Sequence, residues 1–567
     1  MESFYAHDGL VLINYTKTYL KTPADLLDSE EFRYFICLFM EDLKKTNYDL
    51  YTFLTTIAYN RRIDNLIRLL KMLTVLNLDE IEQFSEHERK MLEQVVEAAY
   101  LFWRNQQRIS LMETYHVDGF LLNSFLDADS NFNTMIRTFY RQLQEKLQGN
   151  SNLVYRQLQS GTNAGILVTH VERTYPLKYQ VLNTVPLISK VLLHTPLIIH
   201  PHSNKRKGMF TPTMMNPMST LNFNPNEYFT LPMWVGDSLC HLVFHRNYTA
   251  VALGCVNLFE LADPNTVASK QADLIILFGI NDGLKETTYY HDETNDIWIG
   301  KISVDEPIDY FGYFKKMALT LHNLKNIHAK KLPIHGAMIE ITFKDGSRKG
   351  VVLMGDSGAG KSESIAAMTK IAGNRIDHQE VIFDDMGAMY FDQNHNIVAS
   401  GTEIGAFVRL DDLDKGTAYK DLDRSIFFNP ETANSRVVLP TTPYKDVIAQ
   451  HKVDVFLYAN NYDQRLGIEL FNNAEDAKAV FKQGRRFALG TTNEVGISDT
   501  FFANPFGPMQ EQALTNPLID DVFEAIATNE SIQLGQIFTH LGLEDKGDDK
   551  LEAAANALLD LVCPKSE

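Results

Sequence analysis

The sequence predicts a mixed α/β protein with a helical N-terminal region, and three observations carry this prediction. No proline lies between Pro23 and Pro176, and Gly119 and Gly149 are the only glycines from Leu10 to about residue 160, so this stretch should be nearly all helix. From about residue 160, short apolar runs separated by Pro, Gly and Asn clusters indicate strands and loops. Near residue 355 a strand, a glycine-rich loop and a helix follow one another, which is typical of an α/β unit.

The composition is that of a globular protein that is soluble in water. Of the 567 residues, 45% are hydrophobic and 22% are charged, and no run approaches the roughly 18 apolar residues that a membrane-spanning helix needs. The first residues show no export signal, so we expect a cytoplasmic protein with no membrane partner. The formal charge of −19 disfavours nucleic acid as a partner, and the 4 cysteines show no CxxC spacing that would indicate a zinc site.

We expect four regions along the chain: residues 1–150 as a helical N-terminal region, 151–310 and 311–530 as mixed α/β domains, and 531–567 as a small helical tail. In the first region, Ser85 and Glu88 match a capping box at the start of an amphipathic helix. Such helices carry no chemistry. Their expected role is core packing or self-association of the protein.

A glycine-rich loop follows a predicted hairpin. Residues 337–343 alternate as a strand does, the chain turns at Asp345 and Gly346, and it returns through Val351–Met354 into the loop. A helix that stops at Gly373 comes next. The loop matches GxxxxGKS and consists of Gly355, Asp356, Ser357, Gly358, Ala359, Gly360, Lys361 and Ser362.

This loop pattern predicts that ATP is bound through its phosphates. Its backbone N–H groups can converge on phosphate oxygens, Lys361 can neutralise the transferred group, and the Ser362 hydroxyl can hold Mg²⁺. Roughly twenty residues later, the apolar segment Glu380–Phe383 ends in Asp384 and Asp385, where a metal-holding carboxylate belongs. The sequence therefore predicts an enzyme of phosphoryl transfer.

Several motifs, in this order, resemble those of the phosphoenolpyruvate carboxykinases, particularly the ATP-dependent type. The loop spelling GDSGAGKSE also resembles HPr kinase/phosphorylase, which shares that nucleotide-binding core. The further motifs resemble the family's Y-G-G-E-M-K-K, M-H-C, T-E-N-T-R and F-G-x-P-F, and they lie respectively at Tyr310–Lys316, Ile334–Gly336, Thr432–Arg436 and Asn504–Gly507. The resemblance covers roughly Gly300 to Gly507 and implies a carboxykinase-like core with the substrate side in residues 151–310.

The resemblance also implies the roles of particular residues. Lys316, His335 and Asp385 would hold Mn²⁺, with the lysine neutral so that it can donate its lone pair. Ser362 and Asp384 would hold the metal ion of the nucleotide. Arg436 would contact both nucleotide and substrate. The implied catalytic residues are Arg173, Tyr310, Lys316, Ser357, Lys361, Asp384 and Arg436.

The chain departs from the family in three places. Arg173–Val181 matches the family's substrate-binding segment R-S-P-K-D-K-Y-x-V with the proline shifted by one residue, and the resemblance implies that Arg173 and Tyr310 hold the substrate. Phe383–Gly387 lacks the downstream acid and histidine of G-D-D-E-H, and Gly490–Gly496 lacks the arginine of G-T-E-R-G. These changes leave open the adenine contacts and the carboxylation substrate, and the helical N-terminal region also differs from the family.

We therefore expect an ATP- and metal-dependent enzyme of gluconeogenesis that converts oxaloacetate and ATP to phosphoenolpyruvate, CO2 and ADP. Two alternatives stay open: a P-loop kinase for another small-molecule or protein acceptor, and a non-catalytic ATP-binding regulatory module. The basic cluster Lys205–Lys207 is expected to be a solvated turn. His322 and His328 compete with His335 as metal ligands, but only His335 directly precedes a strand that leads toward the loop.

Overall fold

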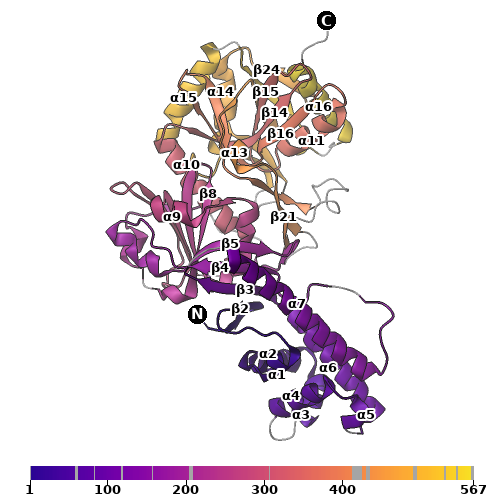
Figure 1. Cartoon of the computed structure of the whole chain (residues 1–567). Helices are drawn as coiled ribbons and strands as arrows, with labels where there is room; N and C mark the ends of the chain where they lie inside the picture. Colours follow the sequence, from indigo (N-terminus) through magenta and orange to yellow (C-terminus); the bar gives the residue numbers. More distant parts are fainter. Residues whose placement is uncertain are drawn as a thin grey trace. The chain divides into compact units, whose positions relative to one another are not determined.

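The computed structural model of the chain describes residues 2–57, 62–81, 83–115, 119–155, 158–203, 209–221, 223–304, 307–410, 424–428, 435–489, 495–528, 531–543 and 547–563. The chain forms two compact units (Figure 1): unit 1 is Met1–Val171 with Pro186–Ile198, and unit 2 is Glu172–Val185 with Ile199–Glu567. Both units contain helices and sheets, which confirms the mixed α/β class. Unit 1 extends beyond the boundary expected at residue 150.

The strands of unit 1 lie side by side in chain order. They are β1 (Phe4–His7), β2 (Leu10–Asn14), β3 (Gln107–Thr114), β4 (Ala164–Thr169) and β5 (Leu187–Leu193). The pairs β1–β2 and β4–β5 are antiparallel, and β2–β3 and β3–β4 are parallel. The expectation of nearly continuous helix is therefore wrong at β2 and β3. Between Pro23 and β3 the chain contains neither proline nor glycine, so the missing breakers gave no sign that the helix had ended.

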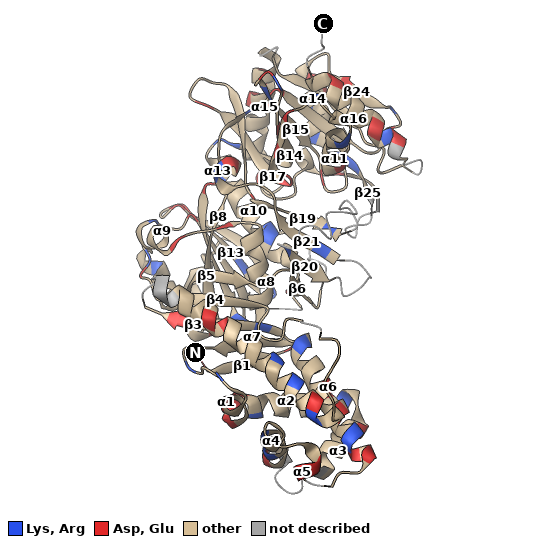
Figure 2. Ribbon diagram, turned by 45° about the vertical axis from the view of Figure 1, so that its right-hand side comes forward, with Lys and Arg blue, Asp and Glu red and all other residues tan. Residues whose placement is uncertain are grey.

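The helices of unit 1 connect β2 to β3 and β3 to β4. They are α1 (Pro23–Asp28), α2 (Glu30–Thr46), α3 (Tyr48–Ile57), α4 (Arg62–Leu73), α5 (Leu78–Ile81), α6 (Glu86–Asn105) and α7 (Gly119–Gln148). The predicted capping box of α6 is confirmed: the Glu88 N–H donates to Ser85 Oγ at 3.2 Å, and the Ser85 N–H donates to the Glu88 carboxylate at 2.8 Å. Basic and acidic residues are mixed along α6 and α7 (Figure 2), while their apolar faces form the core of the unit.

In unit 2, one sheet has the strand order β8-β9-β11-β13-β12. These strands are β8 (Tyr228–Val235), β9 (Ser238–His245), β11 (Leu274–Ile280), β12 (Thr287–Asp292) and β13 (Ile297–Ser303). Helix α10 (Phe311–His328) packs on this sheet, where Phe314 stacks on Phe278 with ring centroids 3.8 Å apart. Gly300 leaves room for the Met317 side chain, which would lie 2.5 Å from an added Cβ atom. This helix carries Lys315 and Lys316, two lysines of the candidate active site.

The other large sheet of unit 2 has the order β22-β18-β17-β14-β15-β23-β27-β24, and β16 pairs with β14. The strands are β14 (Leu332–Thr342), β15 (Arg348–Met354), β16 (His378–Phe383), β17 (Met386–Phe391), β18 (Ile397–Gly401), β22 (His451–Lys452), β23 (Val455–Asn460), β24 (Gly467–Leu470) and β27 (Gln533–Phe538). The predicted β14–β15 hairpin is confirmed, with Gly346 at φ 81° in its turn. Strands β15, β23 and β27 are parallel, so their carboxyl ends lie at one edge, beside the glycine-rich loop.

Further elements surround this sheet. They are α11 (Lys361–Ala372), β19 (Gly405–Arg409), β20 (Ser425–Phe428), β21 (Ser435–Pro440), α14 (Ala474–Gln483), β25 (Arg485–Leu489), β26 (Val495–Asp499), α15 (Gln512–Thr528) and α16 (Asp548–Val562). The expectation of a purely helical tail is wrong, because β27 lies between β23 and β24 and only α16 is helical. Among the helices that the structure describes, none is both long and apolar enough to cross a membrane.

Candidate active site

The glycine-rich loop lies between β15 and α11, as predicted. Gly358 and Gly360 have φ angles of 79° and 93°, a region that favours glycine because other residues meet steric strain there. A Cβ atom on Gly360 would also lie 2.6 Å from Thr539. Helix α11 begins directly at Lys361, so its first N–H groups point into the loop and form a ready anion site.

Three side chains that the sequence motifs did not identify hold this loop in place. Asn461 donates to the Gly358 carbonyl at 3.0 Å, and Thr539 donates to the Ala359 carbonyl at 2.8 Å. Arg486 lies 3.1 Å from the Asp356 carboxylate and is 4% exposed. Asn461 and Thr539 come directly after β23 and β27, so only knowledge of the strand order could have placed them beside the loop.

The side chains predicted to bind phosphate and metal lie at the mouth of the loop. Lys361 Nζ donates to the carbonyl oxygens of Gly355 at 2.7 Å and Asp356 at 3.1 Å. Ser362 Oγ donates to Asp384 Oδ1 at 2.6 Å, which brings together the hydroxyl and the carboxylate predicted to hold the nucleotide's metal ion. Burial raises the pKa of Asp384 to about 6, so a cation there would offset an unfavourable buried charge.

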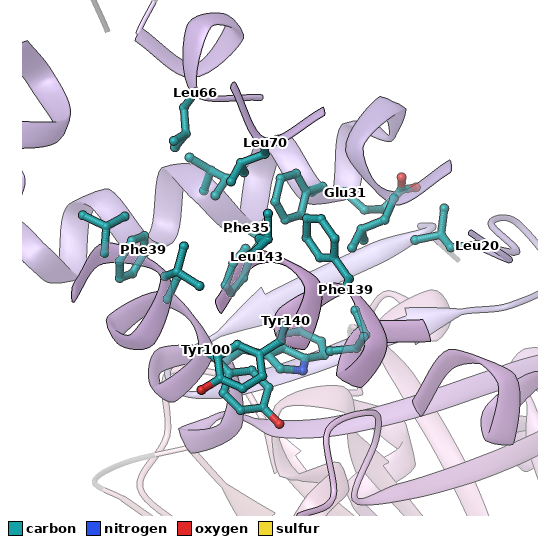
Figure 3. Close-up of a pocket in the computed structure, with 18 of the residues that line it drawn as sticks. Leu20, Glu31, Phe35, Phe39, Leu66, Leu70, Tyr100, Phe139, Tyr140 and Leu143 are labelled. Carbon is teal, nitrogen blue, oxygen red and sulfur yellow. The ribbon is translucent and has the colours of Figure 1, made fainter. Parts of the chain in front are cut away.

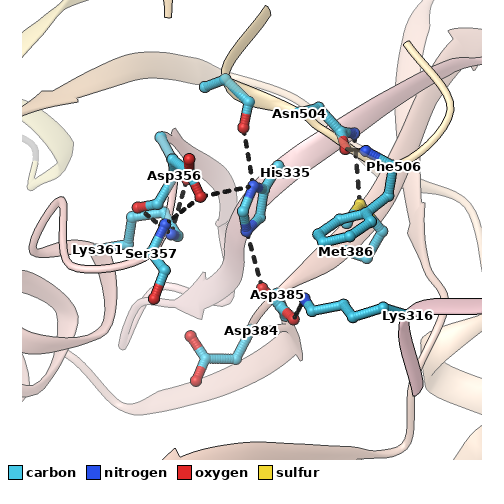
Figure 4. A network of polar contacts seen from close by, with 12 residues as sticks. Lys316, His335, Asp356, Ser357, Lys361, Asp384, Asp385, Met386, Asn504 and Phe506 are labelled. Atoms are coloured by element: carbon cyan, nitrogen blue, oxygen red, sulfur yellow. Dashed lines mark hydrogen bonds and ion pairs between the residues drawn. The ribbon is translucent and has the colours of Figure 1, made fainter. Parts of the chain in front are cut away.

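Beside the loop, the structure brings together Lys316, His335 and Asp385 from three separate segments (Figure 4). Lys316 Nζ lies 2.9 Å from Asp385 Oδ2, and His335 Nε2 lies 3.0 Å from Asp385 Oδ1. The other histidine nitrogen lies 3.5 Å from Asp356, so this cluster adjoins the glycine-rich loop. These are the three residues that the family resemblance implies as Mn²⁺ ligands.

The orientation of His335 is fixed by a backbone carbonyl. His335 Nδ1 lies 2.8 Å from the Ala503 oxygen, which can only accept, so Nδ1 carries the hydrogen. Phe502 and Ala503 have positive φ angles of 51° and 48°, an uncommon turn that points this carbonyl at the ring. Nε2 therefore faces the Asp385 carboxylate either with a second proton or with a lone pair. In the second case a cation is required between the two acceptors.

Lys315 and Glu403 extend the cluster inward, and sequence reasoning did not identify either residue as functional. Lys315 is 1% exposed in its side chain, and its Nζ atom lies 2.7 Å from Asp385 and 2.9 Å from Glu403. Burial opposes the charge of Lys315, but Asp385 and Glu403 together raise its pKa above the ordinary lysine value. Burial lowers the pKa of Lys316, and the neighbouring Lys315 charge adds to this effect against the opposing pull of Asp385. Lys315 is thus the fixed cation and Lys316 the lysine that loses its proton more readily.

Aromatic rings border the cluster and bring Arg436 near it. The Phe506 ring centroid is 4.5 Å from Lys316 Nζ. The Phe407 ring centroid lies 5.8 Å from Lys315 Nζ and 5.0 Å from Arg436 Cζ. Arg436, predicted to contact nucleotide and substrate, therefore shares the aromatic neighbour Phe407 with Lys315. Rings at this position lower the local dielectric and strengthen the electrostatic interactions of the site.

Arg173 and Tyr310 are not placed in this cluster by any contact that the structure describes. Arg173 is 3% exposed, and its guanidinium donates to Thr230 at 2.9 Å and to the Leu182 carbonyl at 2.7 Å. These bonds give Arg173 a structural role, and the prediction that it holds substrate gains no support. Tyr310, six residues before Lys316 in the chain, is the N-cap residue of α10, and its ring covers Gly312.

The competing histidines are accounted for elsewhere. His322 is buried near Ser238 at 3.2 Å, and its pKa falls to about 4 because of burial. His328 packs against Trp298, with ring centroids 5.0 Å apart. In the described part of the chain, neither histidine bonds to Asp385. The segments Lys205–Lys207, Thr432–Asn434 and Gly490–Glu494 lie outside the described residues.

The donor set fits two different metal ions. Ser362 and Asp384 supply oxygen ligands, as Mg²⁺ on a nucleotide phosphate prefers. His335 Nε2 and Asp385 Oδ1 are 3.0 Å apart, close to the roughly 3 Å between neighbouring ligands of an octahedral ion with bonds of about 2.1 Å. Among the described residues, no three or more His, Cys, Asp and Glu side chains form a metal-binding group. The Mn²⁺ set is therefore complete only with a neutral lysine.

Comparison with known proteins assigns no family. The sequence matches no protein-family model, and no curated protein matches it. The geometry of the site is therefore the basis on which a function can be proposed.

Proposed function

We propose that this chain is a phosphoenolpyruvate carboxykinase-like enzyme with a carboxykinase-like core, which uses ATP and divalent metal ions to convert oxaloacetate to phosphoenolpyruvate, CO2 and ADP. The observation that carries the proposal is the convergence of Lys316, His335 and Asp385 beside the glycine-rich loop. An ordinary P-loop kinase needs only the metal ion of its nucleotide, held here by Ser362 and Asp384. A second, protein-held ion is what a decarboxylating enzyme would require.

In this reaction, the C–C bond to the leaving carboxylate breaks, its electrons form an enolate, and the enolate oxygen attacks the γ-phosphorus of ATP. Lys316, His335 and Asp385 would hold Mn²⁺, whose positive charge would stabilise the enolate. Lys361 and the N–H groups at the start of α11 orient the phosphates for transfer. Lys315 keeps Asp385 ionised by holding the pKa of that carboxyl well below its ordinary value, although burial alone would raise it. Arg436 supplies a guanidinium for the transferred phosphoryl group.

A second candidate function is a P-loop kinase for another acceptor. It is favoured by Arg173, because the guanidinium predicted to hold the substrate is already hydrogen-bonded to the protein. In that case ATP would be consumed with a hydroxyl-bearing acceptor and without oxaloacetate.

A coupled assay separates the two candidates. The protein is given ATP, Mn²⁺ and oxaloacetate, and phosphoenolpyruvate formation is followed. The carboxykinase proposal expects phosphoenolpyruvate and ADP in equal amounts. ADP that forms only when a different acceptor is added would contradict the carboxykinase proposal and support the kinase.

The metal site itself can be measured without turnover. Electron paramagnetic resonance titration of Mn²⁺ in the absence of ATP should detect a site that His335→Ala weakens by about tenfold or more. His328→Ala is the matched control, because His328 lies at the exposed end of α10. A wild-type protein without this site, or an equal loss in the control, would remove the main support for the carboxykinase.

A further inference from the structure

The core of unit 1 contains a cavity of about 130 Å³ (Figure 3). It lies between strands β1 and β2 and helices α1, α2, α4, α6 and α7, all within unit 1. The walls are almost entirely aliphatic and aromatic, and they include Phe35, Phe39, Leu70, Phe139 and Leu143. Protein interiors are normally packed as densely as organic crystals, so a void of this size within one core is unusual.

Three aromatic side chains that border the cavity, Tyr100, Trp103 and Tyr140, direct their polar atoms to partners in the protein. Tyr100 and Tyr140 stack with ring centroids 3.7 Å apart, and Figure 3 shows the stacked pair at one side of the cavity. The Tyr100 hydroxyl lies 2.6 Å from Ser160 Oγ, and the Tyr140 hydroxyl donates to Glu97 at 2.7 Å. Trp103 Nε1 donates to the Ser160 carbonyl at 2.6 Å. These groups leave the cavity surface apolar, and water is not stabilised in such a space.

We propose that this cavity binds a small, neutral, apolar molecule about the size of one aromatic ring. An apolar cavity of about 150 Å³ lined by Leu, Ile and Phe stays dry and binds benzene, which sets the size of the occupant. The rings of Phe35 and Phe139 offer edge and face contacts to an aromatic guest. Glu31 is the one charged side chain among the described lining residues, so an anionic guest is disfavoured.

Benzene is the probe, and the full-length protein is the sample. Hydrogen–deuterium exchange with and without saturating benzene should show slower exchange of amides in α2, α6 and α7 and unchanged exchange in α11. Ala99→Leu adds three carbon atoms from a lining position on α6 and should weaken benzene binding at least tenfold. Ala98→Leu is the matched control, because Ala98 packs against the same core and does not line the cavity.

Two results overturn the proposal. One is unchanged exchange in α2, α6 and α7 of the wild type at saturating benzene, and the other is equal protection of the wild type and Ala99→Leu. If Ala99→Leu does not fold, Leu143→Phe fills the cavity from α7 and takes its place. Hexanoate in place of benzene should give at least tenfold weaker protection, and equal protection by the anion would contradict the neutral-ligand assignment.

Discussion

The cavity of unit 1 and the phosphate-loop site of unit 2 differ in the chemical groups that they offer to a ligand. The cavity walls are apolar, and the polar atoms of Tyr100, Trp103 and Tyr140 bond to the protein. The phosphate-loop site instead concentrates two lysines, a histidine and two carboxylates within hydrogen-bonding distance. The first can recognise shape and size. In the proposed function, the second holds phosphates and metal ions and stabilises a charged transition state.

This difference also affects what each region tolerates. Apolar contacts are non-directional, so a substitution at the cavity changes the free energy of unfolding by an amount that grows with the cavity volume it creates or removes. Charges in the phosphate-loop site depend on one another, because removal of one partner leaves a buried charge uncompensated. The variants below test this division, from the largest expected effect to the smallest.

Lys361→Ala should lower turnover by about 10³-fold or more, because a preorganised charge at the transferred phosphoryl group would be lost. The fold should survive, since among the described residues Lys361 Nζ bonds to two carbonyl groups of its own loop, those of Gly355 and Asp356. Turnover and thermal unfolding without nucleotide are the two measurements. A collapse of thermal stability together with activity would mean that Lys361 serves the fold and not the phosphates.

Lys315→Met and Lys316→Met should differ, although the two residues are neighbours on α10. Lys315→Met leaves Asp385 and Glu403 without their shared cation and should lower the free energy of unfolding by about 3–5 kcal/mol. Lys316→Met should cost much less stability, because burial already lowers the pKa of Lys316. It should instead weaken Mn²⁺ binding by about tenfold or more.

The pH dependence of Mn²⁺ binding gives a further readout for this pair. Lys316 must lose its proton to ligate a metal ion, so the affinity of the wild type should rise with pH, in a window below the ordinary lysine pKa of 10.5. Lys316→Met should flatten this part of the profile. Equal losses of stability in the two variants, with the profile unchanged, would contradict the separate roles of the two lysines.

Asp384→Asn should stabilise the metal-free protein at pH 7 while abolishing use of Mg²⁺–ATP. The folded-state pKa of Asp384 is raised, mainly by burial, to about 6 from 3.8, so folding binds a proton and stability is lost as pH rises from 4 to 6. The loss is up to roughly 3 kcal/mol, which the variant should recover. Denaturant unfolding at pH 4 and pH 7 measures it.

Asp385→Asn is the matched control for Asp384→Asn. Lys315, Lys316 and His335 lower the pKa of Asp385 against the effect of burial, so this carboxylate contributes stability above its ordinary pKa that is lost as pH falls. Asp385→Asn should therefore destabilise the protein at pH 7. Stabilisation by both substitutions would show that the two neighbouring carboxylates share one environment, contrary to the structure.

The loop, its flanking hairpin and the Asp384 position could be predicted because each rests on a local rule. A phosphate loop needs glycines at positive φ, a lysine and a hydroxyl within eight consecutive residues, Gly355–Ser362, and the structure has this arrangement. The capping box at Ser85 is equally local. Such features depend on spacing alone, so the printed sequence is enough to find them.

Contacts between distant segments could not be predicted from spacing. Arg486, Asn461 and Thr539 reach the glycine-rich loop from strand ends that become neighbours only through the order β15-β23-β27-β24 and the short sheet β25–β26. Lys315 precedes Lys316 in the segment Tyr310–Lys316, and only the fold shows that it pairs with Glu403. Arg173 shows the same limit, because an alignment of residue types cannot show that its guanidinium donates to the Leu182 and Val185 carbonyl groups.

The smallest effect is expected at the helix cap of α6 in unit 1, whose residues Ser85 and Glu88 do not line the cavity. Ser85→Ala removes the hydroxyl that accepts from the Glu88 N–H, so an N–H group in the first turn loses its partner, and the free energy of unfolding should fall by about 1 kcal/mol.

Ser85→Asp restores an acceptor at the same position and should recover most of the lost stability. Hydrogen exchange should show faster opening at the start of α6 in Ser85→Ala and unchanged exchange in α11. ATP affinity, measured by titration calorimetry, should equal that of the wild type, because every residue placed at the nucleotide site lies in unit 2. If ATP affinity fell together with the stability of α6, the two units would be energetically coupled, and the division between an apolar binding region and a separate catalytic region would have to be given up.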